Sequence, residues 1–242
     1  MSDNSRPRIV LLTTDTPHHI YYAGELKKRF GLDGIVIETR ALKAPFATRH
    51  PFEDERDHFE KSALLNGGPR TLESLAESFS SESVNDEKSV AWLHRIKPEF
   101  IFVFGTGKVG PSVIQSAQRY CLNLHGGDPE HYRGLDSHLW TIYHKDFDRL
   151  MTTLHCVDAT LDTGDIVAQA RVPLGNTLKL YGLRAANTRL CVQLSLRALE
   201  IYQDIGSIPR RRQIQKGRYY SFMPSDLKSE CVKTFERFVE TL

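Results

Sequence analysis

The order of elements at the start of the chain constrains the fold most. Residues 8–12 form a short apolar run that predicts a buried strand. Residues 20–30 predict a helix that ends at Gly31, and residues 35–39 predict a second strand. A strand, a helix and a strand joined by short connections favour a parallel sheet with a right-handed crossover.

Later segments extend this pattern. Further strands are predicted at 101–104, 123–125, 151–157 and 166–172, and further helices at 89–95, 111–120, 135–144, 178–204 and from about 227. Short helices and loops are predicted over 44–90, and a short hairpin over 214–220. The fold class is therefore α/β: a Rossmann-like, mainly parallel twisted sheet with flanking helices and a short C-terminal hairpin and helix extension. We expect a catalytic domain over 1–208 and the extension over 209–242.

Composition narrows the class of protein. Of the 242 residues, 40% are hydrophobic and 26% are charged, which is typical of globular enzymes. The net charge of +2 gives no argument for nucleic-acid binding. The apolar runs are far shorter than the roughly 20 residues that span a bilayer, and residues 1–7 are polar, so we expect a cytoplasmic protein without a membrane partner. The cysteines lack metal or redox spacing; they are Cys121, Cys156, Cys191 and Cys231.

Two short motifs carry the chemistry. Asn123 and His125 are two residues apart, so on a strand that leaves the core they face the same side. Asp162 lies in Leu-Asp-Thr-Gly-Asp (161–165), a segment that an α/β fold can bring to the same sheet edge. Each residue alone has a plainer interpretation, as a hydrogen-bonded core histidine or as turn chemistry. Together they offer an amide, an imidazole and a carboxylate to one site.

A glycine-rich segment, 105–110, follows the strand predicted at 101–104. It lacks the spacing of dinucleotide-binding and Walker loops. A tight strand-to-helix turn is the plainer interpretation, and a backbone wall of a cofactor pocket is the alternative.

These motifs resemble those of the folate-dependent formyltransferases, which include glycinamide ribonucleotide transformylase, methionyl-tRNA formyltransferase and the sugar-nucleotide N-formyltransferases. The elements that carry the resemblance are Asn123-x-His125, the loop at 132–134, the Trp140 helix and 161–165. The resemblance covers residues 88–175 well and extends more loosely to the first strand. It implies transfer of a formyl group from 10-formyltetrahydrofolate to a primary amine, without a metal.

The resemblance also implies the roles of three residues. Asn123 and His125 stabilise the oxyanion formed when an amine attacks the formyl carbon, worth about 3 kcal/mol per donor. His125 relays the amine proton, and Asp162 orients the imidazole and helps to relay protons through water.

The folate contacts that the resemblance implies are positional. They fall after the strand that ends near Gly105, at Thr106, Gly107, Lys108 and Val109, and in the segment from Asp158 to Asp162.

The chain departs from the family pattern beside the catalytic histidine. Residues 127–130 are Gly-Asp-Pro-Glu where most relatives have Ser-Leu-Leu-Pro, and Ser137 replaces a common proline. The loop that borders the amine is therefore unusual, which affects the identity of the substrate more than the chemistry.

The tail favours one acceptor class. About 30 residues follow Pro209, fewer than the β-barrel of the tRNA-acting relatives requires. Aromatic residues at 219–222 resemble the sugar-nucleotide group, so we expect a nucleotide-linked amino-sugar as acceptor, as in lipopolysaccharide O-antigen biosynthesis. Tyr132, Arg133 and Tyr219 are the expected substrate contacts.

Alternatives stay open. The acceptor can be glycinamide ribonucleotide, or water in a formyltetrahydrofolate hydrolase. A catalytically silent binding module is a third interpretation, against which the retention of all three polar residues argues. A homodimer is compatible with the resemblance.

Overall fold

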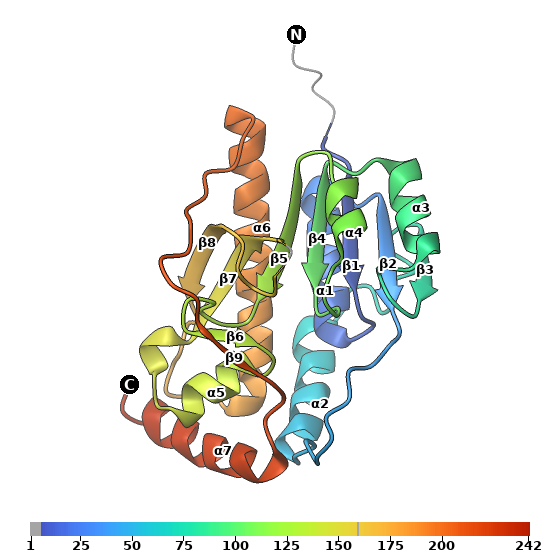
Figure 1. The fold of residues 1–242 in the computed structure, drawn as a ribbon. Coiled ribbons are helices and arrows are strands. Elements are labelled where there is room, and N and C mark those ends of the chain that lie inside the picture. The colour runs from blue at the N-terminus through green and yellow to red at the C-terminus, as the bar shows by residue number, and fades with distance from the viewer. Residues whose placement is uncertain (1–5, 159) are drawn as a thin grey trace.

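The computed structural model describes residues 6–158 and 160–242 and contains a seven-stranded sheet between helices (Figure 1). From edge to edge, the strands are β3 (Ser78–Ser81), β2 (Gly34–Glu38), β1 (Ile9–Thr13), β4 (Phe100–Phe104), β5 (Tyr120–His125), β7 (Met151–Cys156) and β8 (Ile166–Arg171). The first five strands are parallel, β7 is antiparallel to β5, and β8 is antiparallel to β7. The predicted α/β class with a mainly parallel sheet is confirmed.

Helices cover both faces of this sheet. They are α1 (Pro17–Phe30), α2 (Phe52–Leu64), α3 (Glu87–Ile96), α4 (Pro111–Ser116), α5 (Ser137–Tyr143), α6 (Leu183–Ile205) and α7 (Ser225–Val239), with short 3₁₀ turns at Phe147–Arg149 and Leu180–Gly182. Side chains of α1 and α6 join the core on one face, and side chains of α3 and α4 join it on the other. Among the described helices, none has the length and apolar character needed to cross a membrane.

The central strands are continuous apolar runs because both of their faces are covered. Leu11 and Phe102 pack on the α1 side, whereas Leu12 and Val103 pack on the α3 side, and all four are almost completely buried. The register between β1 and β4 pairs Leu11 with Phe102 and Leu12 with Val103. This parallel register aligns the carboxyl ends of β1 and β4 at one edge of the sheet.

The structure corrects two predicted boundaries. The helix expected over 111–120 ends at Ser116, because Tyr120 already belongs to β5 and its N–H donates to Glu99 O at 3.0 Å. The region 44–90 contains the 13-residue helix α2 and also the edge strand β3. A serine-rich strand carries no apolar alternation, and only its backbone pairing with β2 defines it.

The tail contains one strand, within the segment expected to form a hairpin, and the predicted helix. The strand β9 (Arg218–Tyr220) pairs in parallel with β6 (Tyr132–Gly134), not with a neighbouring part of the tail as a hairpin would. The Gly217 N–H donates to Pro129 O at 3.2 Å, and the next N–H, of Arg218, donates to His131 O at 3.0 Å. Helix α7 packs against α5 at the end of the molecule below the sheet (Figure 1). The domain boundary at 208 stays a prediction.

Candidate active site

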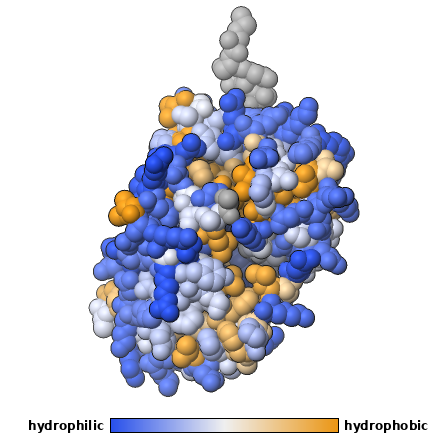
Figure 2. Space-filling view, in the orientation of Figure 1, coloured by the Kyte–Doolittle hydropathy of each residue, from blue (hydrophilic) through white to orange (hydrophobic). Residues whose placement is uncertain are grey.

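A cavity of about 370 Å³ lies where β4 and β5 end and where the chain leaves β7. In open α/β sheets, ligands bind beyond the carboxyl ends of parallel strands. In Figure 2, apolar side chains gather along the middle of the visible face, and hydrophilic side chains cover most of its margins. The ends of β4 and β5 fall in this middle region (Figure 1).

Two kinds of element line the cavity. We call the first the loop half; it comprises residues 103–109, 157–158 and 160–162. We call the second the helix half; it comprises His18, His19, Phe52, Arg56, residues 134–139, Leu180, Leu183, Arg184 and Asn187. Asn123, His125 and His155 line the cavity from the strands between these halves.

The structure brings the three predicted catalytic side chains together. Asn123 Nδ2 donates to Asp162 Oδ1 at 3.3 Å, and His125 Nδ1 lies 3.7 Å from Asp162 Oδ2. The Gly134 N–H donates to Asp162 Oδ2 at 2.9 Å. His125 and Asp162 are each only 6% exposed, so these contacts are largely shielded from solvent.

The partners of His125 define where it takes up a proton. Its Nε2 lies 2.8 Å from Tyr132 O, which can only accept, so Nε2 carries the hydrogen of the neutral ring. Nδ1 is therefore the position that a proton can join, and the carboxylate of Asp162 faces it.

Asp162 is held as a carboxylate. Burial alone would raise its pKa, but His125, two interactions with His155 and the Gly134 N–H together hold the pKa of Asp162 below its usual range. The backbone at Asp162 has φ +54°, a left-handed conformation that is uncommon outside glycine. The site therefore keeps a fixed negative charge beside the imidazole.

Sequence reasoning missed His155, which completes the polar cluster. It lies opposite Asn123 in the antiparallel pairing of β5 with β7. Its Nδ1 donates to Cys156 O at 2.8 Å, and its Nε2 lies 3.0 Å from Asn123 Nδ2. Nε2 also lies 3.4 Å from Asp162 Oδ1. A histidine in a predicted strand was visible in the sequence, but its position opposite Asn123 depends on strand register.

The predicted folate positions line the loop half. Thr106, Gly107, Lys108, Val109 and Asp158 all contact the cavity, and Ala159 lies outside the described residues. The glycine-rich segment forms the connection from β4 to α4, as the plainer interpretation had it, and it also lines the cavity.

A buried carboxylate fixes this connection. Glu38 Oε2 accepts from the Gly107 N–H at 2.6 Å, and Glu38 Oε1 accepts from the Val84 N–H at 3.1 Å. Gly105 has φ +81°, and a Cβ there would come within 2.4 Å of the His19 ring, so the start of the turn requires glycine.

The three predicted substrate residues lie outside the cavity lining. The Tyr132 hydroxyl donates to Asp146 at 3.1 Å. Arg133 donates through Nε to Gly217 O at 2.7 Å and through a terminal nitrogen to Leu161 O at 2.9 Å. Tyr219 is 50% exposed on β9. Tyr132 and Arg133 thus hold the structure around the site, and a substrate role for the three stays a prediction.

The helix half contains neutral imidazoles. His18 and His19 are 6% and 3% exposed in the first turn of α1, so they both begin the helix and border the cavity. Burial lowers the pKa of both well below that of free histidine, and Arg184 and Arg56 lower that of His18 further. Both rings are therefore uncharged at neutral pH.

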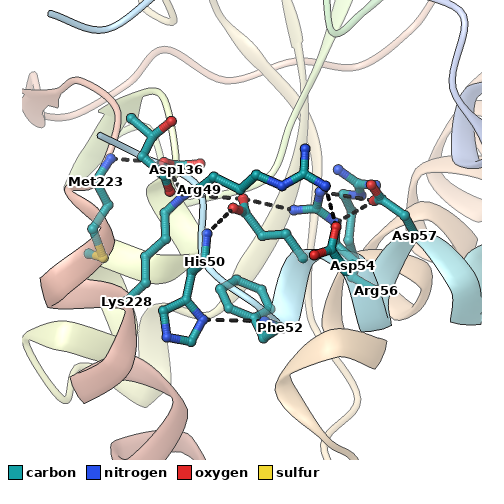
Figure 3. Close-up of polar contacts among 12 residues, drawn as sticks. Arg49, His50, Phe52, Asp54, Arg56, Asp57, Asp136, Met223 and Lys228 are labelled. Atoms are coloured by element: carbon teal, nitrogen blue, oxygen red, sulfur yellow. Dashed lines mark hydrogen bonds and ion pairs between the residues drawn. The ribbon is translucent and has the colours of Figure 1, made fainter. Parts of the chain in front are cut away.

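Ion pairs surround these imidazoles. Arg184 binds Glu60 through two nitrogens at 2.6 and 2.7 Å, and Glu60 is completely buried. Arg56 lies 2.9 Å from Asp57 and 3.3 Å from Glu53. Both arginines of the helix half are thus paired with carboxylates of α2, and Figure 3 shows Arg56 beside Asp57.

The C-terminal helix extends this network. Lys228 is 2% exposed, and its Nζ donates to Glu53 at 3.1 Å and to Thr48 O at 2.6 Å. Lys228 also lies 3.9 Å from Asp136, which accepts from the Met223 N–H at 2.8 Å (Figure 3). Burial raises the pKa of Asp136, and Lys228 opposes that effect. Asp136 lines the cavity, so α7 supports a wall of the site.

Among residues 6–158 and 160–242, no three His, Cys, Asp or Glu side chains come together in a way that could hold a metal ion.

Comparison of the sequence with known families gives the family of this protein. A family model described as formyl transferase matches residues 52–189, more than half of the chain. The chain therefore belongs to the formyl transferase family.

Curated relatives match over shorter stretches. The methionyl-tRNA formyltransferase of Geobacter sulfurreducens is 30% identical over 93 residues, which cover 38% of this chain and 29% of that protein. The Syntrophus aciditrophicus enzyme of the same name is 29% identical over 121 residues, which cover 50% and 38%. The chain thus spans less than half the length of these relatives.

Solved structures share the fold over most of the chain. HypX from Aquifex aeolicus, in complex with tetrahydrofolic acid, has a TM-score of 0.61 at 18% identity and covers 93% of this chain and 31% of that one. A 4-N formyltransferase from Francisella tularensis has a TM-score of 0.58 at 17% identity, covering 88% and 76%. A sugar N-formyltransferase from a Shewanella species has a TM-score of 0.54 at 16% identity, covering 93% and 79%. At these identities the likeness establishes the fold.

Proposed function

We propose that this protein transfers the formyl group of 10-formyltetrahydrofolate to the primary amine of a nucleotide-linked amino-sugar. The convergence of Asn123, His125 and Asp162 at one cavity is the observation that carries the proposal. Family membership supports formyl transfer, and the tetrahydrofolic acid bound by HypX supports folate as the donor.

The residues divide the reaction between them. The amine nitrogen bonds to the formyl carbon, the bond from that carbon to folate N10 breaks, and one proton passes from the amine to N10. His125 takes up this proton at Nδ1 and returns it, and Asp162 stabilises the imidazolium meanwhile. Asn123 Nδ2 exchanges its long 3.3 Å contact with Asp162 for the developing oxyanion.

The loop half fits a folate donor. It combines backbone groups of residues 105–109 with the apolar side chains of Val103, Val109, Val157 and Leu161. A flat heterocycle with hydrogen-bonding edges matches a site of this composition. Because Glu38 fixes the Gly107 N–H, the backbone here is arranged before a ligand binds.

The helix half fits a polyhydroxylated amine. His138 Nε2 donates to Met151 O at 2.7 Å, which leaves its Nδ1 as an acceptor. Asn187 Oδ1 accepts from Thr152 at 2.6 Å, which leaves its Nδ2 as a donor. Neutral donors and acceptors of this kind can bind sugar hydroxyls, which carry no charge. The sugar N-formyltransferase among the structural neighbours agrees with this choice of acceptor.

Methionyl-tRNA is a second acceptor to test, because the curated relatives carry that name. The purified protein would be incubated with 10-formyltetrahydrofolate and a panel of UDP-, dTDP- and GDP-linked amino-sugars, glycinamide ribonucleotide and methionyl-tRNA. Mass spectrometry would detect the gain of one formyl group, and formate would be measured without an acceptor. Product with an amino-sugar alone supports the proposal; product only with another acceptor, or formate release alone, rejects it.

A further inference from the structure

The segment after α6 crosses the loop that carries Asp162. Arg211 and Ile166 exchange two backbone hydrogen bonds, at 2.8 and 2.9 Å, directly after this loop. Two residues further on, Gln213 Nε2 donates to Asp162 O at 3.0 Å and to Gly164 O at 2.9 Å. One amide group therefore bridges both sides of the turn.

The Gln213 amide contributes as a donor. Its nitrogen faces two carbonyl oxygens, which can only accept, so the reverse orientation would place oxygen against oxygen. Among the residues that the structure describes, Gln213 Oε1 is buried without a hydrogen-bond partner. The contact thus depends on the two N–H groups, and the oxygen adds no bond.

The turn needs contacts of this kind. Asp162 adopts the left-handed conformation at φ +54°, which non-glycine residues hold only when the surroundings require it. Arg133 binds Leu161 O at 2.9 Å, so three carbonyls of the loop have fixed donors. In this conformation the Asp162 carboxylate accepts from the Gly134 N–H.

We propose that Gln213 is a positioning residue for Asp162. Its two N–H bonds hold the left-handed turn, which keeps the carboxylate on the Gly134 N–H and beside His125. The effect on turnover rests on the proposed function, whereas the effect on the carboxylate does not.

Two variants and a matched control test this role. Q213M keeps the length of the side chain and removes its donors, and Q213K restores a donor without the unused oxygen. Q215M changes the same residue type in the same segment, where Gln215 Nε2 donates to Glu130 O at 3.1 Å. Q213M should lower kcat roughly 10- to 100-fold, with acceptor KM within a few-fold. Q213K should recover part of the loss, and Q215M should match the wild type.

The Gly134 amide supplies a readout that does not need activity. In a ¹H–¹⁵N spectrum its proton should move upfield in Q213M, return in Q213K and stay in place in Q215M. An unmoved signal in Q213M, or a kcat loss that Q215M shares, overturns the proposal. If the wild type transfers no formyl group, the proposed function fails, and the amide shift still decides the role of Gln213.

Discussion

The two halves of the cavity are built in different ways. The loop half is formed by the segments that leave β4 and β7, and it offers backbone groups and apolar side chains. The helix half is formed by α1, α2, α5 and α6 and offers histidines and paired charges. Backbone groups stay available when the side chains change. Contacts of this kind in the loop half therefore suit a formyl donor that all members of a family share. Contacts in the helix half are made by side chains, which depend on the sequence of this protein. They therefore suit the selection of a particular acceptor.

The largest effect is expected from replacing His125, which lies between the two halves. His125→Ala deletes the proton acceptor beside Asp162, and we expect turnover to fall at least about 10³-fold. Affinity for tetrahydrofolate should stay within a few-fold, because the loop half is unchanged. The measurements are kcat and a calorimetric folate titration, with His94→Ala, an exposed histidine of α3, as control. Full activity in H125A would refute the assignment.

The second prediction concerns Lys228, whose ion pairs support the helix half. Lys228→Met leaves Glu53 and Asp136 without their buried cation, and we expect a loss of about 2–3 kcal/mol in the free energy of unfolding. Acceptor KM should rise on the order of 10-fold, about 1.4 kcal/mol, while folate affinity holds.

Denaturant unfolding and steady-state kinetics measure these effects. Lys233→Met, an exposed position on the same helix, is the matched control. The double variant K228M/E53Q should recover part of the stability, because it removes a partly buried carboxylate that has lost one of its two cations. Equal weakening of donor and acceptor binding in K228M would contradict the division between the halves.

The third prediction breaks the loop half. The Glu38 carboxylate accepts hydrogen bonds from the backbone N–H groups of Gly107 and Val84. In Glu38→Gln an amide NH₂ replaces one of the two acceptor oxygens, so one of these N–H groups loses its partner. We expect tetrahydrofolate to bind about 10-fold more weakly, consistent with the loss of one charged hydrogen bond. Acceptor KM at saturating donor should not change. Glu82→Gln, whose side chain is 81% exposed, serves as control; a change confined to acceptor KM would count against this role.

Sequence reasoning reached the loop half and the catalytic trio but little of the helix half. Strands such as β1 and β4 are apolar runs that could be predicted from the sequence. Asp162 follows β7, which is antiparallel to β5, so the expectation that it meets Asn123 rested on the family resemblance. The glycine-rich connection at 105–110 could be placed because it directly follows such a strand.

The remaining contacts join residues that are distant in the sequence. Lys228 binds Glu53 across 175 positions, and Gln213 binds Asp162 across 51, so no local pattern announces either pair. His155 required the register of an antiparallel pair. Arg133 binds the backbone carbonyls of Leu161 and Gly217, which no local pattern could show, and a substrate role for it stays a prediction.

The smallest predicted effect sharpens the comparison through pH. Burial lowers the pKa of His138 in the helix half to about 4, below its value of about 6.5 in an unfolded chain. Between these values the unfolded chain binds more protons at this residue, so the contribution of His138 to the free energy of unfolding falls as pH drops from 7 to 5. His138→Gln retains a donor for Met151 O and removes the imidazole that binds the extra proton in the unfolded chain. From pH 7 to pH 5 the variant should therefore lose about 1 kcal/mol less free energy of unfolding than the wild type.

Urea unfolding at the two pH values measures this difference, with exposed His94→Gln as the matched control. His18 and His19 remain in H138Q and should preserve part of the pH dependence, since burial lowers their pKa values too. The same loss in H138Q and the wild type would mean that His138 is not held neutral. The helix half would then carry a positive charge at mildly acidic pH, and its fit to an uncharged sugar would hold only near neutrality.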